Sequence, residues 1–290
     1  MEITRIAPSP TGVLHIGTIR TAYFNYLIGK QCEDSKMILR IDDTDASRNI
    51  PELVKPLFDT LAWLGMDYDS TFNQSDRYER YTEVAELLLS KGYAKKEDGE
   101  QGTCIRLDAT KLDEFSADWK DTIGGDMISN DFFNGLAKNQ VIIKSDGTPV
   151  YHFASTVDDF DSKITWIVRG VDHIGNTYNH SLLFRILSKV LEEELFPKFT
   201  HVGLVCHSNN KKISKRDSEE LKLDGYNPQA LLNYVLRLGW SPKQDDKSNN
   251  IIDGEKAIKL FVEEGNMRSA NSKIDMNKLA WYEKVYSRMK

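Results

Sequence analysis

A histidine and a glycine stand where a helix opens, directly after the first predicted strand. The stretch APSPTGVLHIGT, residues 7–18, ends on His15-Ile16-Gly17 and continues into a helical pattern. Backbone N–H groups at a helix start favour an anion, and a glycine lets a phosphate approach the backbone closely. His15 adds a side-chain donor. An isolated motif of this kind is more often a histidine that only caps its helix, so a second observation is needed.

The second observation is a basic loop late in the chain. The stretch KKISKR, residues 211–216, places Lys212, Lys215 and Arg216 together between a predicted strand and predicted helices. Such a cluster taken alone is more often a solvated surface. The combination of this loop with the helix start at His15 is more informative than either motif alone.

The elements that must position these residues alternate between strands and helices. Short apolar runs predict strands, and apolar residues at helical spacing predict helices between them. The predicted strands span residues 3–7, 36–41, 164–170 and 200–206, and the predicted helices span 16–27, 51–64, 76–91 and 176–195. This alternation predicts an α/β fold with a parallel sheet that binds ligands at the carboxyl edge of its strands.

Residues 104–150 interrupt the alternation and form a predicted insertion. A predicted hairpin begins within this insertion. It spans residues 141–153, VIIKSDGTPVYHF, and turns at Asp146-Gly147. The last part of the chain is predicted to be helical and to form a small second unit. Its three predicted helices span residues 228–240, 253–265 and 273–290.

The composition is that of an ordinary globular chain of 290 residues, with 40% hydrophobic and 28% charged residues and a net charge of −6. The acidic balance argues against a protein that coats nucleic acid without specificity. Cys32, Cys104 and Cys206 are widely spaced and lack a partner at metal-ligand spacing, which fits a reducing cytoplasm. The first residues lack a signal-peptide pattern, and no apolar run reaches membrane-spanning length. We expect a soluble, cytoplasmic protein that binds no membrane.

Five stretches resemble the blocks of a known family and follow its order. They are RIAPSPTGVLHIGT (5–18), LRIDDTDASRN (39–49), SDGTPVYHFASTVDDFDSKITWIVRGVDHIGNT (145–177), KKISKRD (211–217) and YNPQALLNYVLRLGWSP (226–242). The helix start and the KISK loop resemble the paired signature of class I aminoacyl-tRNA synthetases, and the five stretches resemble the glutamyl-tRNA synthetase family within that class. KIDMNKLAWYEKVY looks like the family's stem-contact helix, so the resemblance covers nearly the whole chain.

The resemblance implies a fold and a domain order. A Rossmann-like catalytic domain with a parallel sheet would comprise residues 1–103 and 151–217. An inserted α+β subdomain that binds the acceptor end would comprise residues 104–150, and a helical stem-contact domain would comprise residues 218–290. Full-length members continue into a helical anticodon-binding domain, for which these 290 residues show no matching stretch. The resemblance therefore implies a short form, which is a minimal synthetase, a paralog that uses another acceptor, or part of a longer product.

The resemblance also assigns residues to two substrates. The glutamate site is implied at Arg5, Ser9, Asp42, Tyr151 and Arg169. The ATP site is implied at Thr11, Gly12, His15, Gly17, Lys212, Ser214, Lys215 and Arg216, of which His15, Lys212 and Lys215 are the expected catalytic groups. Two arginines and one acid match the two carboxylates and one ammonium of glutamate, and a guanidinium can hold a carboxylate by two hydrogen bonds. Mg²⁺ is expected on the ATP phosphates, without a protein metal site or a structural zinc.

Two positions depart from the family pattern. Asp42 stands where the family's RIEDTD block has a glutamate, which is one methylene longer. The substrate ammonium would therefore have to shift toward Asp42 or be reached through water. Val171 replaces an acidic residue. Asp158, Asp159 and Asp161 are expected to have structural roles rather than to bind a metal.

The implied reaction is ATP-dependent activation of L-glutamate as glutamyl-adenylate and its transfer to the acceptor arm of tRNA, by a monomeric ligase. Enzymes of the glutamyl type need tRNA for the activation step. One alternative is a glutamyl-queuosine tRNA(Asp) synthetase-like enzyme, which activates glutamate without tRNA and usually carries a zinc-binding cysteine group in the insertion, where this chain has only Cys104. The others are glutamylation of a non-RNA acceptor and a synthetase-like binding module without catalysis.

Overall fold

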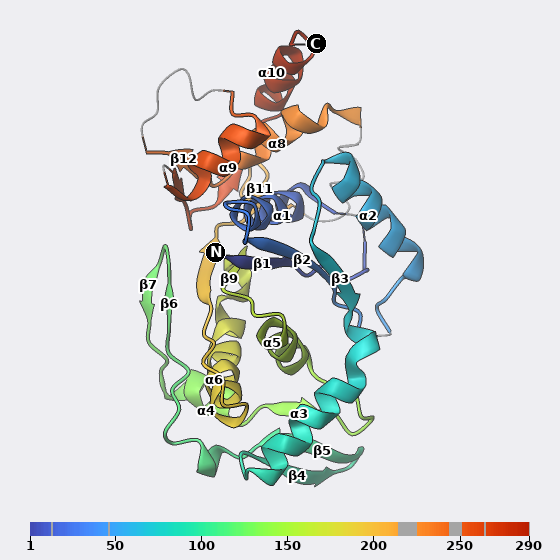
Figure 1. Cartoon of the computed structure of the whole chain (residues 1–290), viewed down its shortest axis with the longest axis vertical. Helices are drawn as coiled ribbons and strands as arrows, with labels where there is room; N and C mark the ends of the chain where they lie inside the picture. The colour runs from blue at the N-terminus through green and yellow to red at the C-terminus, as the bar shows by residue number, and fades with distance from the viewer. Residues whose placement is uncertain (13, 46, 214–224, 244–250, 264, 290) are drawn as a thin grey trace.

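A parallel sheet built from two halves forms the centre of the computed structural model, which describes residues 1–12, 14–45, 47–213, 225–243, 251–263 and 265–289 (Figure 1). The first half contains β1 (Ile3–Ile6), β2 (Lys36–Ile41) and β3 (Ser70–Asn73), and the second contains β9 (Trp166–Gly170) and β10 (Lys198–Val202). The halves meet where the backbone N–H of Thr165 donates to the carbonyl oxygen of Ile3, at 2.9 Å. The parallel strands therefore run in the order β3-β2-β1-β9-β10, and the order reverses between β1 and β9.

Helices cover both faces of this sheet, with α1 (Ile16–Gly29) on one face and α5 (Tyr151–Asp161) on the other (Figure 1). The double cover explains why β2 is buried from Met37 onward and is apolar there except for Arg40. The other described helices are α2 (Val54–Trp63), α3 (Tyr78–Ser90), α4 (Asp131–Lys138), α6 (Ile174–Val190), α8 (Pro228–Leu236), α9 (Gly254–Glu263) and α10 (Met276–Tyr286), with short 3-10 turns η1 (Pro51–Leu53), η2 (Gln74–Arg77), η3 (Ala109–Lys111) and η4 (Val171–His173).

The segment at 104–150 contributes a strand to the central sheet. β6 (Trp119–Asp121) joins β10 in parallel through the pair Phe199 and Asp121, and β7 (Gly125–Met127) lies antiparallel on β6. The described residues also form three smaller sheets: β4 (Ala94–Gly99) with β5 (Gly102–Leu107) and β8 (Val141–Ile143), β11 (Val205–Cys206) with β14 (Ser272–Lys273), and β12 (Trp240–Pro242) with β13 (Gly265–Met267). Through β6, this segment reaches the strands that carry the candidate site.

Two hydrophobic cores lie on opposite faces of the sheet. The first joins α1 to the C-terminal helices, where the ring of Phe24 packs 5.0 Å from that of Phe261 and the ring of Trp240 packs 5.8 Å from Phe261. The second joins α3, α5 and α6 to residues of 104–150, and Trp119 packs 5.6 Å from Phe199 within it. Both the insertion and the C-terminal helices therefore share a core with the central sheet.

The predicted hairpin at 141–153 is only partly correct. The turn forms, with Gly147 at a φ of +82°, which favours glycine. The pairing is limited to one bridge between Ile143 and Pro149, because proline has no N–H to continue a ladder. Tyr151 then begins α5 instead of continuing a strand, and Phe153 is one of the apolar side chains that this helix buries.

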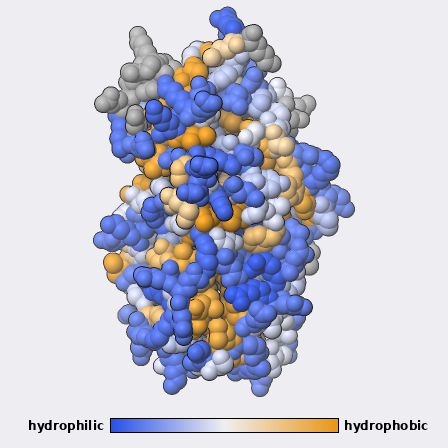
Figure 2. Space-filling view, in the orientation of Figure 1, coloured by the Kyte–Doolittle hydropathy of each residue, from blue (hydrophilic) through white to orange (hydrophobic). Residues whose placement is uncertain are grey.

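None of the described helices is both long enough and apolar enough to cross a bilayer. Figure 2 shows hydrophilic side chains over most of one face, with smaller hydrophobic patches between them. Apart from methionines near the two ends of the chain, the most exposed large apolar side chains among the described residues are Ile128 and Phe132. Ile128 lies just before α4, and Phe132 lies within it.

Candidate functional site

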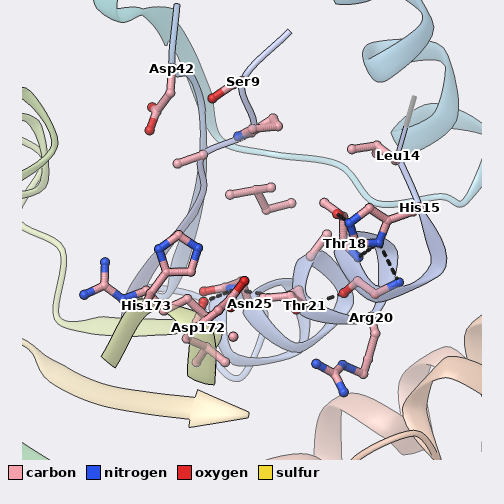
Figure 3. Close-up of a pocket in the computed structure, with 18 of the residues that line it drawn as sticks. Ser9, Leu14, His15, Thr18, Arg20, Thr21, Asn25, Asp42, Asp172 and His173 are labelled. Atoms are coloured by element: carbon pink, nitrogen blue, oxygen red, sulfur yellow. Dashed lines mark hydrogen bonds between the residues drawn. The ribbon is translucent and has the colours of Figure 1, made fainter. Parts of the chain in front are cut away.

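A cavity of about 350 Å³ lies at the carboxyl ends of β1 and β9. This is where the strand order reverses, and doubly wound sheets bind their ligands at such a junction because the flanking connections leave in opposite directions. Figure 3 shows Asp42 and Ser9 on one side of the cavity and His15 with Thr18 on the other. The volume lies within the range of sites for small molecules.

His15 is the N-cap of α1. Its Nδ1 accepts hydrogen bonds from the backbone N–H of Gly17 at 3.1 Å and of Thr18 at 3.2 Å, and its Nε2 lies 3.1 Å from the Thr18 hydroxyl. A Cβ on residue 17 would approach the imidazole to 3.1 Å, so the glycine gives the ring room to cap the helix. Because Nδ1 accepts, a neutral His15 carries its proton on Nε2. The same imidazole thus caps α1 and lines the cavity.

Lys212 lines the cavity from the segment that follows β11. Its Nζ lies 2.6 Å from Oδ2 of Asp172, and both side chains are about half exposed. Burial raises the pKa of Asp172, but the hydrogen bond from Lys212 and nearby positive charge outweigh this and lower it. Ser214, Lys215 and Arg216, the other predicted members of this loop, lie outside the described residues.

Buried ion pairs beside the cavity join β1 and β2 to α5. Arg40 Nε lies 2.6 Å from Asp42 Oδ1 and 3.7 Å from Asp158 Oδ2, and Arg40 Nη1 lies 2.6 Å from Asp159 Oδ1. Arg5 Nε lies 3.1 and 3.2 Å from the two carboxylate oxygens of Asp159. We term Arg5, Arg40, Asp42, Asp158 and Asp159 the paired cluster, because each guanidinium in it has at least one carboxylate partner.

The aspartates of α5 form ion pairs with arginines of other elements. Asp158 also accepts a hydrogen bond from the Tyr81 hydroxyl at 2.9 Å and lies 2.8 Å from Arg77 Nε. Asp161, at the end of α5, contacts Arg77 and lies 2.9 Å from Arg80 Nη2. These contacts connect α3 to α5 on the far face of the sheet.

Asp42 is the acidic member of the paired cluster that lines the cavity. Burial raises the pKa of this carboxyl to about 6, against the lowering effect of Arg40. Arg40 donates to both of its oxygens, at 2.6 and 3.3 Å. A carboxylate offers about four acceptor positions, so Asp42 retains acceptors for a second donor.

Arg169, at the end of β9, is also buried but has only neutral partners. Its Nε donates to His201 Nε2 at 3.2 Å, its Nη2 donates to the Thr177 hydroxyl at 2.6 Å, and its Nη1 lies 3.5 Å from His180 Nδ1. Within the described part of the chain, no carboxylate lies within ion-pair distance of this guanidinium. Burial lowers the pKa of Arg169 to about 10, and the phenol of Tyr151 opposes this effect. We term Arg169, Thr177, His180 and His201 the neutral cluster.

The histidines around Arg169 are held in the uncharged form. Burial and the charge of Arg169 lower the pKa of His152 to about 4 and that of His180 well below its ordinary value. The same two causes lower the pKa of His173 to about 4. Burial also lowers the pKa of His201, although its hydrogen bond to Asp121 acts in the opposite direction. Arg169 is therefore the charged group at the centre of a set of neutral rings.

The structure brings every described member of the two predicted sites into the lining of this one cavity. These residues are Arg5, Ser9, Thr11, Gly12, His15, Gly17, Asp42, Tyr151, Arg169 and Lys212. Their roles toward substrates stay predictions. The structure places both predicted sets next to each other, which motif order alone does not establish.

Sequence reasoning missed several polar residues that shape the site, namely Arg20, Arg40, Asp121, His180 and His201. Arg20 lines the cavity and donates from Nη1 and Nη2 to the carbonyl oxygens of Leu238 and Gly203, which ties α1 to the C-terminal unit. The available signal was a charged or imidazole side chain inside an apolar strand, as in KMILRI for Arg40 and KFTHV for His201. A buried strand keeps such a residue only when it has partners.

A family model described as the catalytic domain of class I tRNA synthetases for E and Q matches residues 3–101 and 93–281. The chain belongs to this family. The family resemblance and the α/β fold class expected from the sequence are therefore confirmed.

Curated relatives with similar sequences are named glutamate-tRNA ligase. The one from Acholeplasma laidlawii (strain PG-8A) is 36% identical over 299 residues, which cover 97% of this chain and 63% of the relative. One from Wolbachia pipientis subsp. Culex pipiens (strain wPip), glutamate-tRNA ligase 2, is 37% identical over 305 residues, which cover 96% of this chain and 65% of the relative. The chain thus spans less than two thirds of the length of these relatives.

Solved structures of such proteins superpose on the whole chain. A glutamate-tRNA synthetase from Elizabethkingia anophelis matches with a TM-score of 0.84 at 26% identity, and the match covers 100% of this chain and 71% of that one. A glutamate tRNA ligase from Elizabethkingia meningosepticum, crystallised in complex with its amino acid, matches with a TM-score of 0.85 at 26% identity and covers 100% and 70% of the two chains. The fold of the described residues is that of these catalytic regions.

Proposed function

We propose that this chain activates L-glutamate with ATP as glutamyl-adenylate and transfers the glutamyl group to tRNA. The observation that best supports the proposal is the charge arrangement of one cavity. Arg169 is buried with neutral partners, and Arg5 and Asp42 line the same cavity beside the helix start at His15. Two guanidinium groups and one carboxylate complement the two carboxylates and one ammonium of glutamate.

Each of these three groups has bonding capacity left for the amino acid. Asp159 takes Nε of Arg5, so both Nη atoms of Arg5 lie outside that ion pair. Asp42 has acceptor positions beyond those that Arg40 uses, and an incoming ammonium would favour its ionised form. Arg169 brings an uncompensated positive charge, which attracts the carboxylate of an acidic side chain far more strongly than a neutral amide.

The first step joins a carboxylate oxygen of glutamate to the α-phosphorus of ATP and breaks the bond to the β-phosphate oxygen, which releases pyrophosphate. The nucleophile is already ionised at pH 7, so the step requires no general base. The protein contributes by positioning two anions and by stabilising the charge that develops on the transferred phosphoryl group. We assign that stabilisation to the Nε2–H of His15, to Lys212 and to Lys215.

Mg²⁺ would reach the site on the phosphates of ATP, where it neutralises charge. Within the described residues, no group of three or more histidine, cysteine, aspartate or glutamate side chains is placed to hold a metal ion. Lys212 would exchange its ion pair with Asp172 for a phosphate, which a half-exposed pair permits at small cost.

In the second step a ribose hydroxyl at the acceptor end of tRNA attacks the carbonyl of the adenylate, and AMP leaves. We propose that residues 104–150 approach this end and that the C-terminal helices approach the stem. The position of β6 beside β10 supports the first assignment, because β10 in turn pairs with β9, the strand that carries Arg169. We further propose that the protein is a cytoplasmic monomer, which light scattering and cell fractionation test.

Pyrophosphate exchange into ATP tests the proposed function. The purified chain is incubated with each amino acid in turn, with and without tRNA. Exchange with glutamate only in the presence of tRNA supports charging of tRNA. Exchange with glutamate in its absence favours base modification or a non-RNA acceptor, exchange with aspartate shows that Asp42 has changed the specificity, and no exchange under any condition favours a binding module.

A pair of substitutions at His15 separates its two roles. His15→Ala removes both the imidazole and the helix cap, whereas His15→Asn retains a side-chain oxygen that can cap α1. We expect both to lower adenylate formation at least about a hundredfold, since one donor to a developing charge contributes on the order of 3 kcal/mol. Only His15→Ala should also lose about 1 kcal/mol of unfolding free energy. A loss of activity below about threefold in both variants contradicts the assignment.

A further inference from the structure

Arg169 has two N–H donors that the neutral cluster does not take. A guanidinium has five N–H donors, one on Nε and two on each Nη. In this structure His201 Nε2 takes the donor on Nε, Thr177 takes one on Nη2, and His180 Nδ1 faces one on Nη1. One N–H on each Nη atom remains outside the neutral cluster, and the Tyr151 phenol, which lines the same cavity, is a further hydrogen-bond partner of this guanidinium. Donors on the two Nη atoms can bind the two oxygens of one carboxylate together.

His201, which accepts the hydrogen bond from Nε of Arg169, is itself oriented by Asp121, a residue of the inserted segment. Oδ2 of Asp121 accepts from Nδ1 of His201 at 2.7 Å and from the backbone N–H of His201 at 2.9 Å. Oδ1 of Asp121 accepts from the backbone N–H of Ile123 at 2.9 Å and of Gly124 at 2.8 Å. All four bonds require an ionised carboxylate that only accepts. Burial raises the pKa of Asp121, but these hydrogen bonds outweigh it and lower the pKa.

Asp121 thereby fixes the tautomer of His201. With the proton on Nδ1, the other ring nitrogen must accept, and it lies 3.2 Å from Nε of Arg169 and 2.9 Å from the Thr177 hydroxyl oxygen. In the opposite tautomer, or in a charged ring, Nε2 of His201 would carry a proton, and this N–H would face the N–H on Nε of Arg169. His180 requires the reverse assignment, since its Nδ1 faces Arg169 and its Nε2 lies 3.2 Å from Nδ1 of His152. The two rings on Arg169 are thus expected in opposite neutral tautomers.

We propose that Asp121 and His201 are positioning residues for substrate specificity, which hold Arg169 in place by a neutral acceptor so that its charge and its Nη donors serve the side-chain carboxylate of the amino acid. The inference rests on the proposed function, which it deepens. A carboxylate in the place of His201 would hold the guanidinium equally well but would neutralise the charge that selects an acidic substrate. A neutral ring oriented by a more distant carboxylate holds the guanidinium while leaving its charge uncompensated.

Two substitutions at His201 test the role of its acceptor. His201→Leu removes it, whereas His201→Gln retains an oxygen that can accept from Arg169. We expect His201→Leu to raise the KM for glutamate at least about tenfold with little change in the KM for ATP, because a small displacement of a binding group is costly. His201→Gln should recover most of that loss. Equal defects in both variants, or equal changes in both KM values, overturn the inference.

Asp118→Asn is the matched control. Asp118 is also a carboxylate of the inserted segment, and it accepts from the backbone N–H of Ser129 at 2.6 Å, away from Arg169. This variant should leave the KM for glutamate unchanged. A tenfold rise in Asp118→Asn would mean that any disturbance of residues 104–150 impairs the site, and it would overturn the specific role of His201.

Nitrogen NMR of the histidine rings decides the inference without reference to activity, also if a variant fails to fold. In the unsubstituted protein we expect His201 as the Nδ1–H tautomer and His180 as the Nε2–H tautomer, both neutral at pH 7. A charged His201, or His201 protonated on Nε2, overturns the inference. Absence of glutamate-dependent exchange in the unsubstituted protein contradicts the proposed function instead, and the tautomers still decide whether Arg169 is held by a neutral acceptor.

Discussion

The paired cluster and the neutral cluster place the same side chain in opposite electrostatic settings within one cavity wall. Arg40 and Arg169 are both buried, with 2% and 6% of their surface exposed. Arg40 lies within 4 Å of Asp42, Asp158 and Asp159, whereas Arg169 contacts a hydroxyl and two neutral rings. Burial therefore does not distinguish a structural arginine from a binding one.

The two arginines differ in whether their positive charge has a counter-ion when no ligand is bound. Arg40 is compensated in the unliganded protein, so its role is complete when the chain folds. Arg169 is desolvated without a counter-ion, and burial lowers its pKa to about 10. A binding site for an anion needs such a group, because a cation that already has a carboxylate partner has less to gain from a second one.

Arg40→Gln should produce the largest effect, on stability. It leaves three carboxylates buried near one another without their shared cation, and breaking a buried pair in this way costs about 3–5 kcal/mol. Urea denaturation at pH 7 measures this loss. The loss should shrink at pH 5, because removal of the cation raises the carboxyl pKa values and lets the folded state take up protons. An unchanged midpoint would show that the ion pairs are not structural.

Arg169→Gln should instead affect activity more than stability. We expect glutamate-dependent exchange to fall at least about a hundredfold, since truncating one member of a buried charge pair costs about 2–5 kcal/mol. The unfolding free energy should change by less than about 2 kcal/mol, because the partners left behind are neutral. Arg169→Lys, which keeps the charge but loses the planar fork, should be intermediate. A stability loss as large as that of Arg40→Gln would erase the contrast between the clusters.

The neutral histidines predict a pH dependence that His152→Gln should reduce. Folded His152 stays neutral down to a pKa of about 4, whereas the unfolded histidine takes up a proton near its ordinary value of 6.5. The unfolded state therefore binds more protons between these values, and stability falls as the pH drops from 6.5 toward 4. Each such histidine contributes on the order of 1 kcal/mol per pH unit in this window.

Thermal or urea unfolding at pH 7 and pH 5 measures this difference. The variant should lose less stability than the unsubstituted protein over that interval, while above pH 7 both should show the same slope. Asp42 acts in the opposite direction, since its raised pKa of about 6 stabilises the folded state at low pH and that contribution is lost as the pH rises. Identical pH profiles would show that His152 titrates normally in the folded protein.

Lys212→Ala should have the smallest effect on stability. It tests whether burial or distance sets the contribution of an ion pair. Its ion pair with Asp172 is as short as that between Arg40 and Asp159, 2.6 Å in each case, but the side chains of Lys212 and Asp172 are 50% and 40% exposed. Exposed pairs contribute about 0–1 kcal/mol, so the urea midpoint should barely move. A loss comparable to that of Arg40→Gln would show that distance rather than burial sets the cost.

Local sequence signals located most of the elements, and the family resemblance named part of the cavity lining. The alternation of apolar strands with amphipathic helices gave β2 at the predicted residues and placed α1 after His15, because period and capping are properties of neighbouring residues. Because the predicted sheet is parallel, the carboxyl ends of β1 and β9 must lie at the same edge of it. The error at 141–153 has the same origin, since a turn signal at Gly147 says nothing about where pairing stops.

The sequence by itself determined the fold class and the family, and it named residues that the structure brings into the lining of one cavity. Only the tertiary structure decided which of two buried arginines is compensated. That choice depends on Asp159 reaching Arg5 and Arg40 from α5, and on Asp121 reaching His201 from β6. Such contacts join segments that are distant in the chain, and they are fixed by the packing of helices on the sheet and by strand register, which no local pattern records.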